Sequence, residues 1–273
     1  MEITVSICCI TYNHEAYIAD TLKGFLMQET SFPFEIIIHD DASTDKTTEI
    51  IKEFAREDSR IKPIFQTENQ WSQGIKPSPS FVWPRAKGKY LALCEGDDFW
   101  TDPRKLEKQV SFLESNPNFV GCFHNVSIIN TFDEKKSLFY NENKKSRTFG
   151  ISRIICKNPI PTLSVIFRKD TFKVPSDYDK YVVGDWPIHI LNAQHGDYYY
   201  MNEVMGTYRI HSGGIHQGGI NWDANKKKRY LIKILFLLKS LKSNLSKPNL
   251  VLHFRILFDE FRLLYYKLMT VKL

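Results

Sequence analysis

Strand-like and helix-like segments alternate along the first half of this chain, and that alternation is the strongest constraint on its fold. Residues 3–10 and 34–39 are nearly continuous apolar runs, as expected for strands buried on both faces. Residues 15–28 and 47–56, which follow them, repeat apolar side chains at helical spacing. Because the connections are short, each helix crosses over between neighbouring parallel strands. We therefore predict an α/β fold with a mostly parallel sheet flanked by helices.

The remaining body of the chain continues this pattern with two interruptions. Further strands are predicted at 61–65, 89–94, 120–129 and 163–167, and further helices at 105–113 and 187–195. Residues 69–84 are rich in Gly, Pro, Ser and Gln, which predicts a mobile loop above the sheet edge. Residues 131–147 are polar and charged, which predicts an insertion or a poorly ordered loop.

Polar turns follow three of the predicted strands, and two of them are acidic. They lie at residues 11–14, 40–45 and 95–98. Because the carboxyl ends of parallel strands meet at one edge of a sheet, the three turns predict a single ligand site. Asp97 and Asp98 are adjacent carboxylates, which keep both charges most easily when a divalent cation lies between them and an anionic ligand. Acidic residues after a strand are also common turn formers, so the pair alone leaves both interpretations open.

Composition narrows the class of protein. A chain of 273 residues with 42% hydrophobic content can bury a substantial core. Its five cysteines include no CxxC pair, which indicates reduced, buried thiols rather than a disulfide framework or a zinc site. The N-terminal segment lacks the pattern of a signal peptide, so we expect a cytoplasmic protein.

The positive charge is concentrated in the C-terminal part of the chain. From Lys226 onward there are twelve Lys and Arg residues against two acidic residues, whereas the whole chain carries a net charge of only +6. The positive charge therefore indicates a partner that binds this C-terminal segment. We expect that the partner is not a nucleic acid. We divide the chain into a catalytic domain at 1–224 and a basic, amphipathic helical extension at 225–273.

The extension reads as two helices, at 225–241 and 250–269. Lys226, Arg229 and Lys233 share one face of the first helix. Neither segment contains about twenty uncharged residues, so we predict no membrane span. The hairpin could lie on an anionic membrane surface, or it could pack on the body as a cap, and the sequence leaves both open.

Four motifs appear in a fixed order: VSICCITYNHEAYIADTLKGFLMQ, HDDASTDKT, AKGKYLALCEGDDFWTDPRKLEKQ, and VVGDW with YRIHSGG. Together, from about Val5 to about His211, they resemble the inverting family 2 glycosyltransferases of the GT-A fold. The resemblance implies a Rossmann-like GT-A sheet. It also implies transfer, with inversion, of one sugar from a nucleotide diphosphate donor, with a UDP-sugar expected. The acceptor would be a hydroxyl, on a lipid-linked saccharide, in the synthesis of capsule, O-antigen or exopolysaccharide.

The resemblance also assigns roles in the first two turns. Thr11 and Tyr12 would line the nucleotide, with Tyr12 flanking the base. Asp41 would accept hydrogen bonds from the uracil N–H or the ribose hydroxyls. Tyr12 could instead face the core and Asp41 could cap a helix. We interpret Asp45 as a helix cap and Asp40 as a residue that shapes the turn.

At the acidic pair, the resemblance implies that Asp98 contacts Mn²⁺ or Mg²⁺ directly, while Asp97 contacts the ribose, the sugar or metal-bound water. The cation would neutralise charge on the departing nucleotide diphosphate. His211 is expected as a third metal ligand or a diphosphate contact, with a structural role as the alternative. Arg209 and Ser212 are expected near the diphosphate, although Arg209 could instead pair inside the fold.

Asp185 matches the position of the catalytic base. An attacking alcohol must lose its proton, and one carboxylate within reach suffices. The family commonly has an acidic pair here, and Gly184 takes the place of its first member. Asp185 could instead cap the helix predicted from Pro187. Trp100 and Trp186, which come shortly after proposed site residues, could face a sugar ring or pack in the core.

Two other functions fit parts of the pattern. A nucleotidyltransferase shares the sheet and the acidic pair, but it would need a glycine-rich basic loop after the first strand, where residues 11–14 read TYNH. A non-catalytic protein that binds nucleotide sugars is the second alternative. The presence of Asp97, Asp98 and Asp185 together argues against it.

Overall fold

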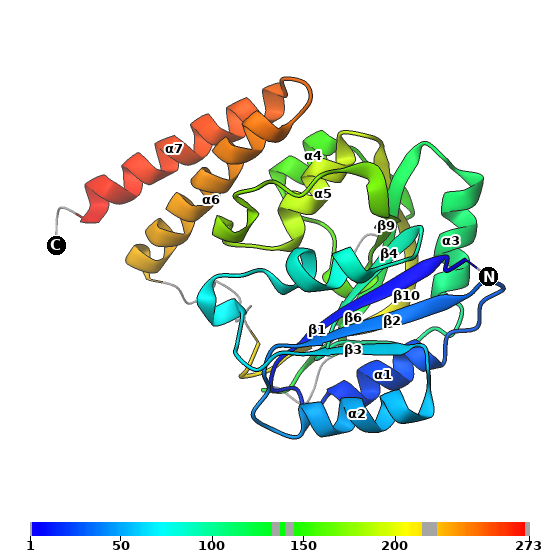
Figure 1. The fold of residues 1–273 in the computed structure, drawn as a ribbon. Helices are drawn as coiled ribbons and strands as arrows, with labels where there is room; N and C mark the ends of the chain where they lie inside the picture. Colours follow the sequence, from blue (N-terminus) through cyan, green and yellow to red (C-terminus); the bar gives the residue numbers. More distant parts are fainter. Residues whose placement is uncertain (1, 133–136, 140–144, 215–222, 271–273) are drawn as a thin grey trace.

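The computed structural model describes residues 2–132, 137–139, 145–214 and 223–270 (Figure 1). The strands are β1 Val5–Thr11, β2 Phe34–Asp40, β3 Ile61–Phe65, β4 Tyr90–Glu95, β5 Phe99–Trp100, β6 Phe119–Asn130, β7 Ser137–Phe139, β8 Arg147–Phe149, β9 Ile166–Arg168 and β10 Asp197–Ile210. The α-helices are α1 Ile18–Leu26, α2 Thr47–Glu57, α3 Lys105–Ser115, α4 Ile151–Cys156, α5 Asp185–Ala193, α6 Ala224–Asn244 and α7 Leu250–Thr270.

These strands form one sheet in the order β3-β2-β1-β4-β9-β6-β10-β5, with β7 beside β6 and β8 beside β10. Strand β1 pairs in parallel with β2 and β4, and β10 pairs in parallel with β6. Strand β9 runs antiparallel between β4 and β6, so the two strands that flank it point the same way. The predicted α/β fold with a mostly parallel sheet is confirmed.

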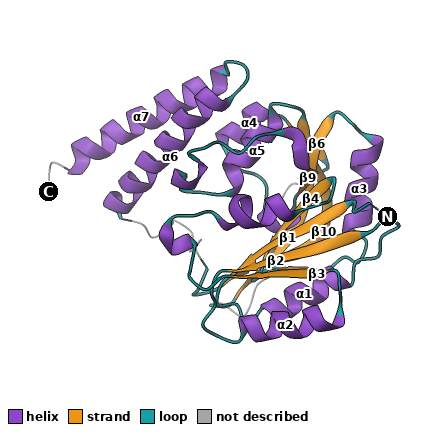
Figure 2. Ribbon diagram, viewed as in Figure 1, coloured by secondary structure: helices purple, strands orange, loops and turns teal. Residues whose placement is uncertain are grey.

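Helices cover both faces of the sheet (Figure 2). Helices α1 and α2 lie against one face, and α4 and α5 lie against the other (Figure 1). Alternate residues of β1 serve two different cores, because successive side chains of a strand point to opposite faces. Ile7 clusters with Leu22 and Phe25 of α1, whereas Cys8 belongs to the cluster that contains Leu91 of β4 and Ile190 of α5.

The predicted mobile loop at residues 69–84 is wrong. The segment forms three short helical turns, Trp71–Gln73, Ser78–Val82 and Trp83–Arg85. Val82 and Trp83 are buried in the core on the α4 and α5 side of the sheet. Proline and serine, which suggested a loop, also suit the first turns of short helices, and the two apolar side chains fix the segment in place.

Three other segments differ from the sequence prediction. The strand predicted at 163–167 is a helical turn, Thr162–Ser164, followed by β9. Of the predicted insertion, residues 133–136 and 140–144 lie outside the described residues, and the described parts include β7 and the start of β8. Strand β10 is fourteen residues long and contains β-bulges that shift its register, and the sequence analysis predicted no strand there.

Helices α6 and α7 form an antiparallel hairpin, and α6 packs on the body (Figure 1). Six apolar residues of α6 are buried: Leu231, Ile234, Leu235, Leu237, Leu238 and Leu241. They share a core with Ile190 of α5, and Ser240 hydrogen-bonds Tyr181 of the body at 2.7 Å. Helix α6 therefore caps the body, as one of the two interpretations of the tail expects.

Helix α7 rests on α4 and α6 through a narrow face. Leu252 and Ile256 are buried, and the fully buried Asp259 pairs with Arg255 and Arg262 at 2.7 and 2.8 Å. The opposite face is exposed and apolar. Among the described residues, no helix combines the length and the apolar character that crossing a bilayer requires.

Candidate functional site

The carboxyl ends of β1, β2 and β4 meet at one edge of the sheet. Thr11 lies opposite Asp40, and Glu95 lies opposite Ile10 in the strand register. Beyond β4 the chain turns through Glu95–Asp98 into β5, which pairs with β10. The end of β10 consequently brings residues 209–214 to the same edge, where the three polar turns predicted from the sequence meet.

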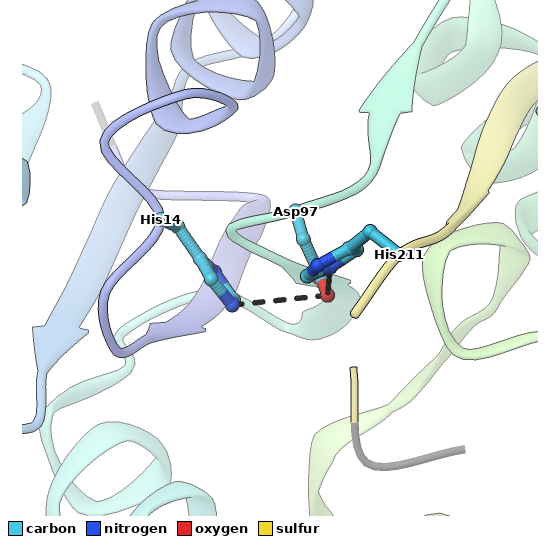
Figure 3. A group of neighbouring side chains, drawn as sticks. All are labelled: His14, Asp97 and His211. Atoms are coloured by element: carbon cyan, nitrogen blue, oxygen red, sulfur yellow. Dashed lines mark hydrogen bonds and ion pairs between the residues drawn. The ribbon is translucent and has the colours of Figure 1, made fainter. Parts of the chain in front are cut away.

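Asp97 lies between two histidines at this edge (Figure 3). Its Oδ2 atom is 3.0 Å from Nε2 of His211 and 3.8 Å from Nε2 of His14. The three ligand atoms lie within 4.8 Å of one another. His211 comes from the segment after β10 and His14 from the turn after β1, so three distant parts of the chain converge here. Burial lowers the pKa of His14, against the charge of Asp97, which raises it.

Asp98 is buried more deeply, and its carboxylate forms a second acidic group with Glu95 and Asp97, whose ligand atoms lie within 4.8 Å of one another. Asp98 is 1% exposed, and its Oδ1 accepts a hydrogen bond from the backbone N–H of Arg209 at 2.8 Å. Its Oδ2 is buried and has no hydrogen-bond partner among the described residues. Burial, and then the charges of Asp97 and Glu95, raise the pKa of Asp98 well above its ordinary value. The two neighbouring carboxylates thus occupy different environments.

Arg209 is paired inside the fold. Its guanidinium donates to the carbonyl of Asp97 at 2.8 Å and to the carboxylate of Asp20 at 2.6 Å. It also lies 4.3 Å from the ring centroid of Phe99. Together with the backbone contact to Asp98, these bonds clamp β10 onto the acidic turn. Ser212, three residues further on, is exposed at the same edge.

Gly96 allows the acidic turn to pack against the turn that follows β1. A Cβ atom at this position would come within 2.5 Å of the Thr11 hydroxyl and 3.1 Å of Nδ1 of His14. The first distance is shorter than real Cβ contacts, so a larger residue would push the two turns apart. Thr11 itself is buried beneath them, 3% exposed.

Glu95 and Asp185 are coupled electrostatically across the site. Burial, followed by the charges of Asp97 and Asp185, raises the pKa of Glu95 to about 8. The half-buried Asp185 also acts on Lys76. Burial lowers the pKa of Lys76, and the charges of Asp179 and Asp185 oppose this shift. Asp185 thus acts on Glu95 and Lys76 through its charge.

Asp185 is the first residue of α5, and Gly184 occupies the cap position without a side-chain capping bond. The interpretation of Asp185 as a helix cap is therefore wrong. One carboxylate oxygen, Oδ2, accepts a hydrogen bond from Asn158 at 2.8 Å. Trp186 and Trp100 are 8% and 1% exposed, so both tryptophans pack in the core and do not face a sugar.

The turn after β2 contains carboxylates that hold backbone in place. Asp41 accepts hydrogen bonds from the N–H groups of Gln70 and Trp71, at 2.8 and 3.0 Å. Asp45 accepts from the N–H of Thr47, at the start of α2, at 3.0 Å. Tyr12, in contrast, is 42% exposed at the rim of the site.

Comparison with known families agrees with this geometry. A model described as Glycosyl transferase family 2 matches residues 6–172, more than half of the chain. This chain is a family 2 glycosyltransferase. The predicted family is thereby confirmed.

Relatives of the glycosyltransferase differ in length and in what their names state. An uncharacterized protein of Mycobacterium tuberculosis is 41% identical over 216 residues, which cover 77% of this chain and 60% of that protein. In Escherichia coli, WfgD is named as a UDP-Glc:α-D-GlcNAc-diphosphoundecaprenol β-1,3-glucosyltransferase. It is 30% identical over 55% of this chain and 59% of WfgD.

Two solved structures share the fold. TarS of S. aureus, in complex with UDP-GlcNAc, has a TM-score of 0.69 and 18% identity over 93% of this chain and 70% of its own. The mannosyltransferase PcManGT of Pyrobaculum calidifontis, in complex with GDP-Man and Mn²⁺, has a TM-score of 0.63 and 16% identity, over 98% and 74% of the two chains. These likenesses confirm the GT-A fold of the glycosyltransferase.

Three polar residues received no role in the sequence analysis, although two of them, His14 and Glu95, lie in turns that it predicted to converge. His14 follows a turn in which Asn13 adopts a positive φ of 54°, and this backbone conformation is what aims the chain at the acidic turn. Glu95 lies two residues before Asp97, separated from it by Gly96, and this third carboxylate in the same turn is a signal that could have been used. Lys76 lies in the segment predicted as a loop, and no sequence motif there indicates a role for this lysine.

Proposed function

We propose that this glycosyltransferase transfers a single sugar, with inversion, from a UDP-sugar to an acceptor hydroxyl. The observation that carries the proposal is the Asp97–His211 pair at the carboxyl edge of the sheet. The complex of TarS with UDP-GlcNAc and the UDP-Glc in the name of WfgD support a UDP-sugar as the donor.

Asp97 and His211 would hold the divalent cation, Mn²⁺ or Mg²⁺. This changes the roles expected from the sequence, which gave direct metal contact to Asp98. Asp97 is the carboxylate that faces His211, whereas Asp98 is buried more deeply and bonded to the Arg209 backbone. An imidazole nitrogen and a carboxylate oxygen suit such an ion, and the bound ion supplies Lewis-acid stabilisation of the departing diphosphate. The Mn²⁺ in the PcManGT complex supports the same choice.

Asp185 would act as the general base. Asn158 binds Oδ2 and fixes the orientation of the carboxylate. The other oxygen would then take the proton of the acceptor hydroxyl as the hydroxyl attacks the anomeric carbon. The N-terminal end of α5 favours a negative charge at this position, because the helix dipole is positive there. A single displacement by one base produces inversion.

Tyr12 and the turn around Thr11 would bind the nucleotide. The exposed ring of Tyr12 can flank the base, whereas both carboxylate oxygens of Asp41 already hold the backbone of residues 70 and 71. We therefore propose that Asp41 shapes the base pocket and binds donor less directly than the sequence suggested. Ser212 remains our candidate for a diphosphate contact, and Arg209 would act by holding the edge together.

We further propose that residues 1–224 form the catalytic domain and that 225–273 bring it to a membrane that carries a lipid-linked acceptor. Seven exposed apolar residues form a stripe along α7: Leu250, Phe254, Leu257, Phe258, Phe261, Leu264 and Tyr265. Helix α6 beside it has seven basic residues and no acidic ones. The ion pair of Lys239 with Glu260, at 2.6 Å, joins the two surfaces. An apolar stripe next to basic residues suits an anionic lipid surface, and WfgD is named for an undecaprenol-linked acceptor.

A screen of sugar nucleotides tests the central proposal. Purified protein is mixed with UDP-, GDP- and dTDP-sugars, each with Mn²⁺, and thermal shift and slow donor hydrolysis are measured. We expect UDP-sugars to stabilise the protein and one of them to be hydrolysed. Asp97→Asn is the control that should lose both effects. A protein stabilised only by GDP- or dTDP-sugars would contradict the choice of donor, and a lack of turnover with every donor and acceptor would favour the non-catalytic alternative.

A further inference from the structure

His14 lies at the metal position without a role in the function proposed so far. Its Nε2 atom is 3.8 Å from the same Asp97 oxygen that His211 approaches at 3.0 Å (Figure 3). The His14 side chain is 14% exposed, so it faces this position within the protein. The three residues come from separate elements, and their side chains converge on one point.

The local backbone holds His14 in this orientation. Its N–H donates a hydrogen bond to the hydroxyl of Thr47 at 2.8 Å, which ties the turn after β1 to the start of α2. The side-chain amide oxygen of Asn13, the preceding residue, accepts from the N–H of Thr44 at 2.8 Å. Nδ1 of His14 is buried and has no hydrogen-bond partner among the described residues. The imidazole is therefore positioned by its backbone and is not held by bonds of its own.

The distances fit coordination. Metal–nitrogen and metal–oxygen bonds are about 2.0–2.2 Å long, so adjacent ligand atoms lie about 3.0–3.4 Å apart in octahedral or tetrahedral sites. The contact between Asp97 and His211 has this separation already, and that between Asp97 and His14 is 3.8 Å. A small side-chain rotation that shortens the Asp97–His14 distance would place both imidazole nitrogens and the carboxylate oxygen around one ion.

The donor set also discriminates between ions. Mg²⁺ prefers oxygen ligands and retains its waters, whereas imidazole suits transition-metal ions. A site with one imidazole can serve either ion, but a second imidazole shifts the preference toward Mn²⁺ and its heavier neighbours in the series.

We propose that His14 is a third protein ligand of the metal and that the His14–Asp97–His211 set selects Mn²⁺ over Mg²⁺. The proposal rests on the proposed function, in which Asp97 and His211 bind the cation. It assigns to the turn after β1 a role in choosing the metal, in addition to its place beside the nucleotide.

The test measures metal binding directly, in the full chain and without donor. Mn²⁺ affinity is taken from electron paramagnetic resonance of the free ion, and Mg²⁺ affinity from its competition with Mn²⁺. We expect His14→Gln to weaken Mn²⁺ binding at least tenfold and Mg²⁺ binding by less than threefold, so that the Mn²⁺ preference falls. His195→Gln replaces an exposed histidine at the far end of α5 and should change neither affinity.

Pulsed spectroscopy of bound Mn²⁺ adds a readout that a merely structural role would not change. Couplings from two imidazole nitrogens are expected in the wild-type protein and from one in His14→Gln. If the variant keeps both couplings, or the wild type shows only one, His14 is not a ligand and the proposal fails. Asp97→Asn distinguishes a failure of the proposed metal site from a failure of the role of His14. If this variant binds Mn²⁺ like the wild type, the proposed metal site itself is wrong. Loss of Mn²⁺ in Asp97→Asn with unchanged binding in His14→Gln overturns only the role of His14.

Discussion

The catalytic edge and the C-terminal hairpin depart from ordinary packing in opposite directions. At the edge, carboxylates are buried close together: Asp98 is 1% exposed, and the pKa of Glu95 is raised to about 8 by burial and by neighbouring charges. On α7, large apolar side chains are exposed, among them Phe261 at 71% and Phe254 at 65%. The edge holds charged groups away from water, whereas α7 exposes apolar surface to water.

Both arrangements cost stability in the isolated chain, and the kind of cost indicates the kind of partner. Buried carboxylates are relieved by a cation, and exposed aromatic stripes are relieved by an apolar environment. The difference supports the proposals that the edge binds a small charged ligand and that the hairpin binds an extended surface. The following experiments test whether the two regions are separable in this way.

Replacing the metal-facing carboxylate should have the largest effect. Asp97→Asn removes the charge that faces both histidines, so we expect at least a thousandfold loss of turnover and no stabilisation by Mn²⁺. Turnover and melting temperature with and without Mn²⁺ measure this. Because the edge and the hairpin are separable, binding to lipid vesicles should remain at the wild-type level. Retention of wild-type turnover after treatment with EDTA would contradict metal dependence.

Asp185→Asn should separate chemistry from binding within the edge. The amide keeps the size of the side chain but cannot accept the proton, so kcat should fall about a hundredfold or more while donor and metal binding persist. Donor affinity by calorimetry and kcat by product formation are compared. A collapse of donor affinity at unchanged fold would move Asp185 into the nucleotide site and leave the base unassigned.

Removing aromatic residues from α7 should affect the hairpin alone. We expect the triple variant Phe254→Ser, Phe258→Ser, Phe261→Ser to bind anionic vesicles at least tenfold more weakly, because each ring contributes apolar area to the interface. Activity on a short water-soluble acceptor should not change. Phe132→Ser, which removes an exposed ring (64%) from the body, is the matched control for vesicle co-sedimentation.

A second outcome would break the comparison. If the wild-type protein binds no vesicles and the triple variant changes a dimer to a monomer in light scattering, the stripe belongs to contacts between copies of the chain. Salt distinguishes the membrane case further, since the basic residues of α6 make vesicle binding weaken as ionic strength rises.

Replacing Lys105, a buried lysine far from any proposed ligand, should have the smallest functional effect. Lys105 is fully buried, with Nζ 2.8 Å from Oε1 of Gln109 and 3.9 Å from the ring centroid of Trp100, and burial lowers its pKa to about 7. Between pH 7 and the ordinary value of 10.5, the unfolded chain binds the extra proton, so stability should rise with pH. Lys105→Met should abolish that rise.

The same variant should be more stable than the wild type, by about 2–4 kcal/mol at pH 7 and below, with the difference vanishing near pH 10.5. Denaturant unfolding across this pH range measures both effects, and turnover should stay unchanged. A wild-type stability that is flat between pH 7 and 10 would show that Lys105 keeps its proton in the folded protein throughout this range.

The sequence predicted the elements that form from local pattern. Continuous apolar runs gave β1, β2 and β4 to within two residues, because a strand buried on both faces has almost no polar positions. The convergence of turns at one edge followed from parallel pairing and needed no side-chain information. The family motifs then supplied the class of enzyme, which local pattern alone did not.

What the sequence could not predict depends on orientation. Asp97 and Asp98 are chemically identical neighbours, and only the turn around Gly96 and the backbone of Arg209 decide which one faces the histidines. Strand β10 escaped prediction because bulges break its alternation. His14 reaches the site after Asn13, whose positive φ of 54° is a conformation that asparagine adopts more readily than most residues but does not always adopt.

The clamp between β10 and the acidic turn has a consequence for the order of folding. Asp97 and His211 are 114 residues apart, so the loop between them must close before the metal position exists. During synthesis, β1 to β4 leave the ribosome well before β10 is made and can begin to pair. A nascent chain therefore gains its sheet first and its capacity for metal only after residue 211 has arrived. Metal uptake would therefore report that synthesis had passed the clamp.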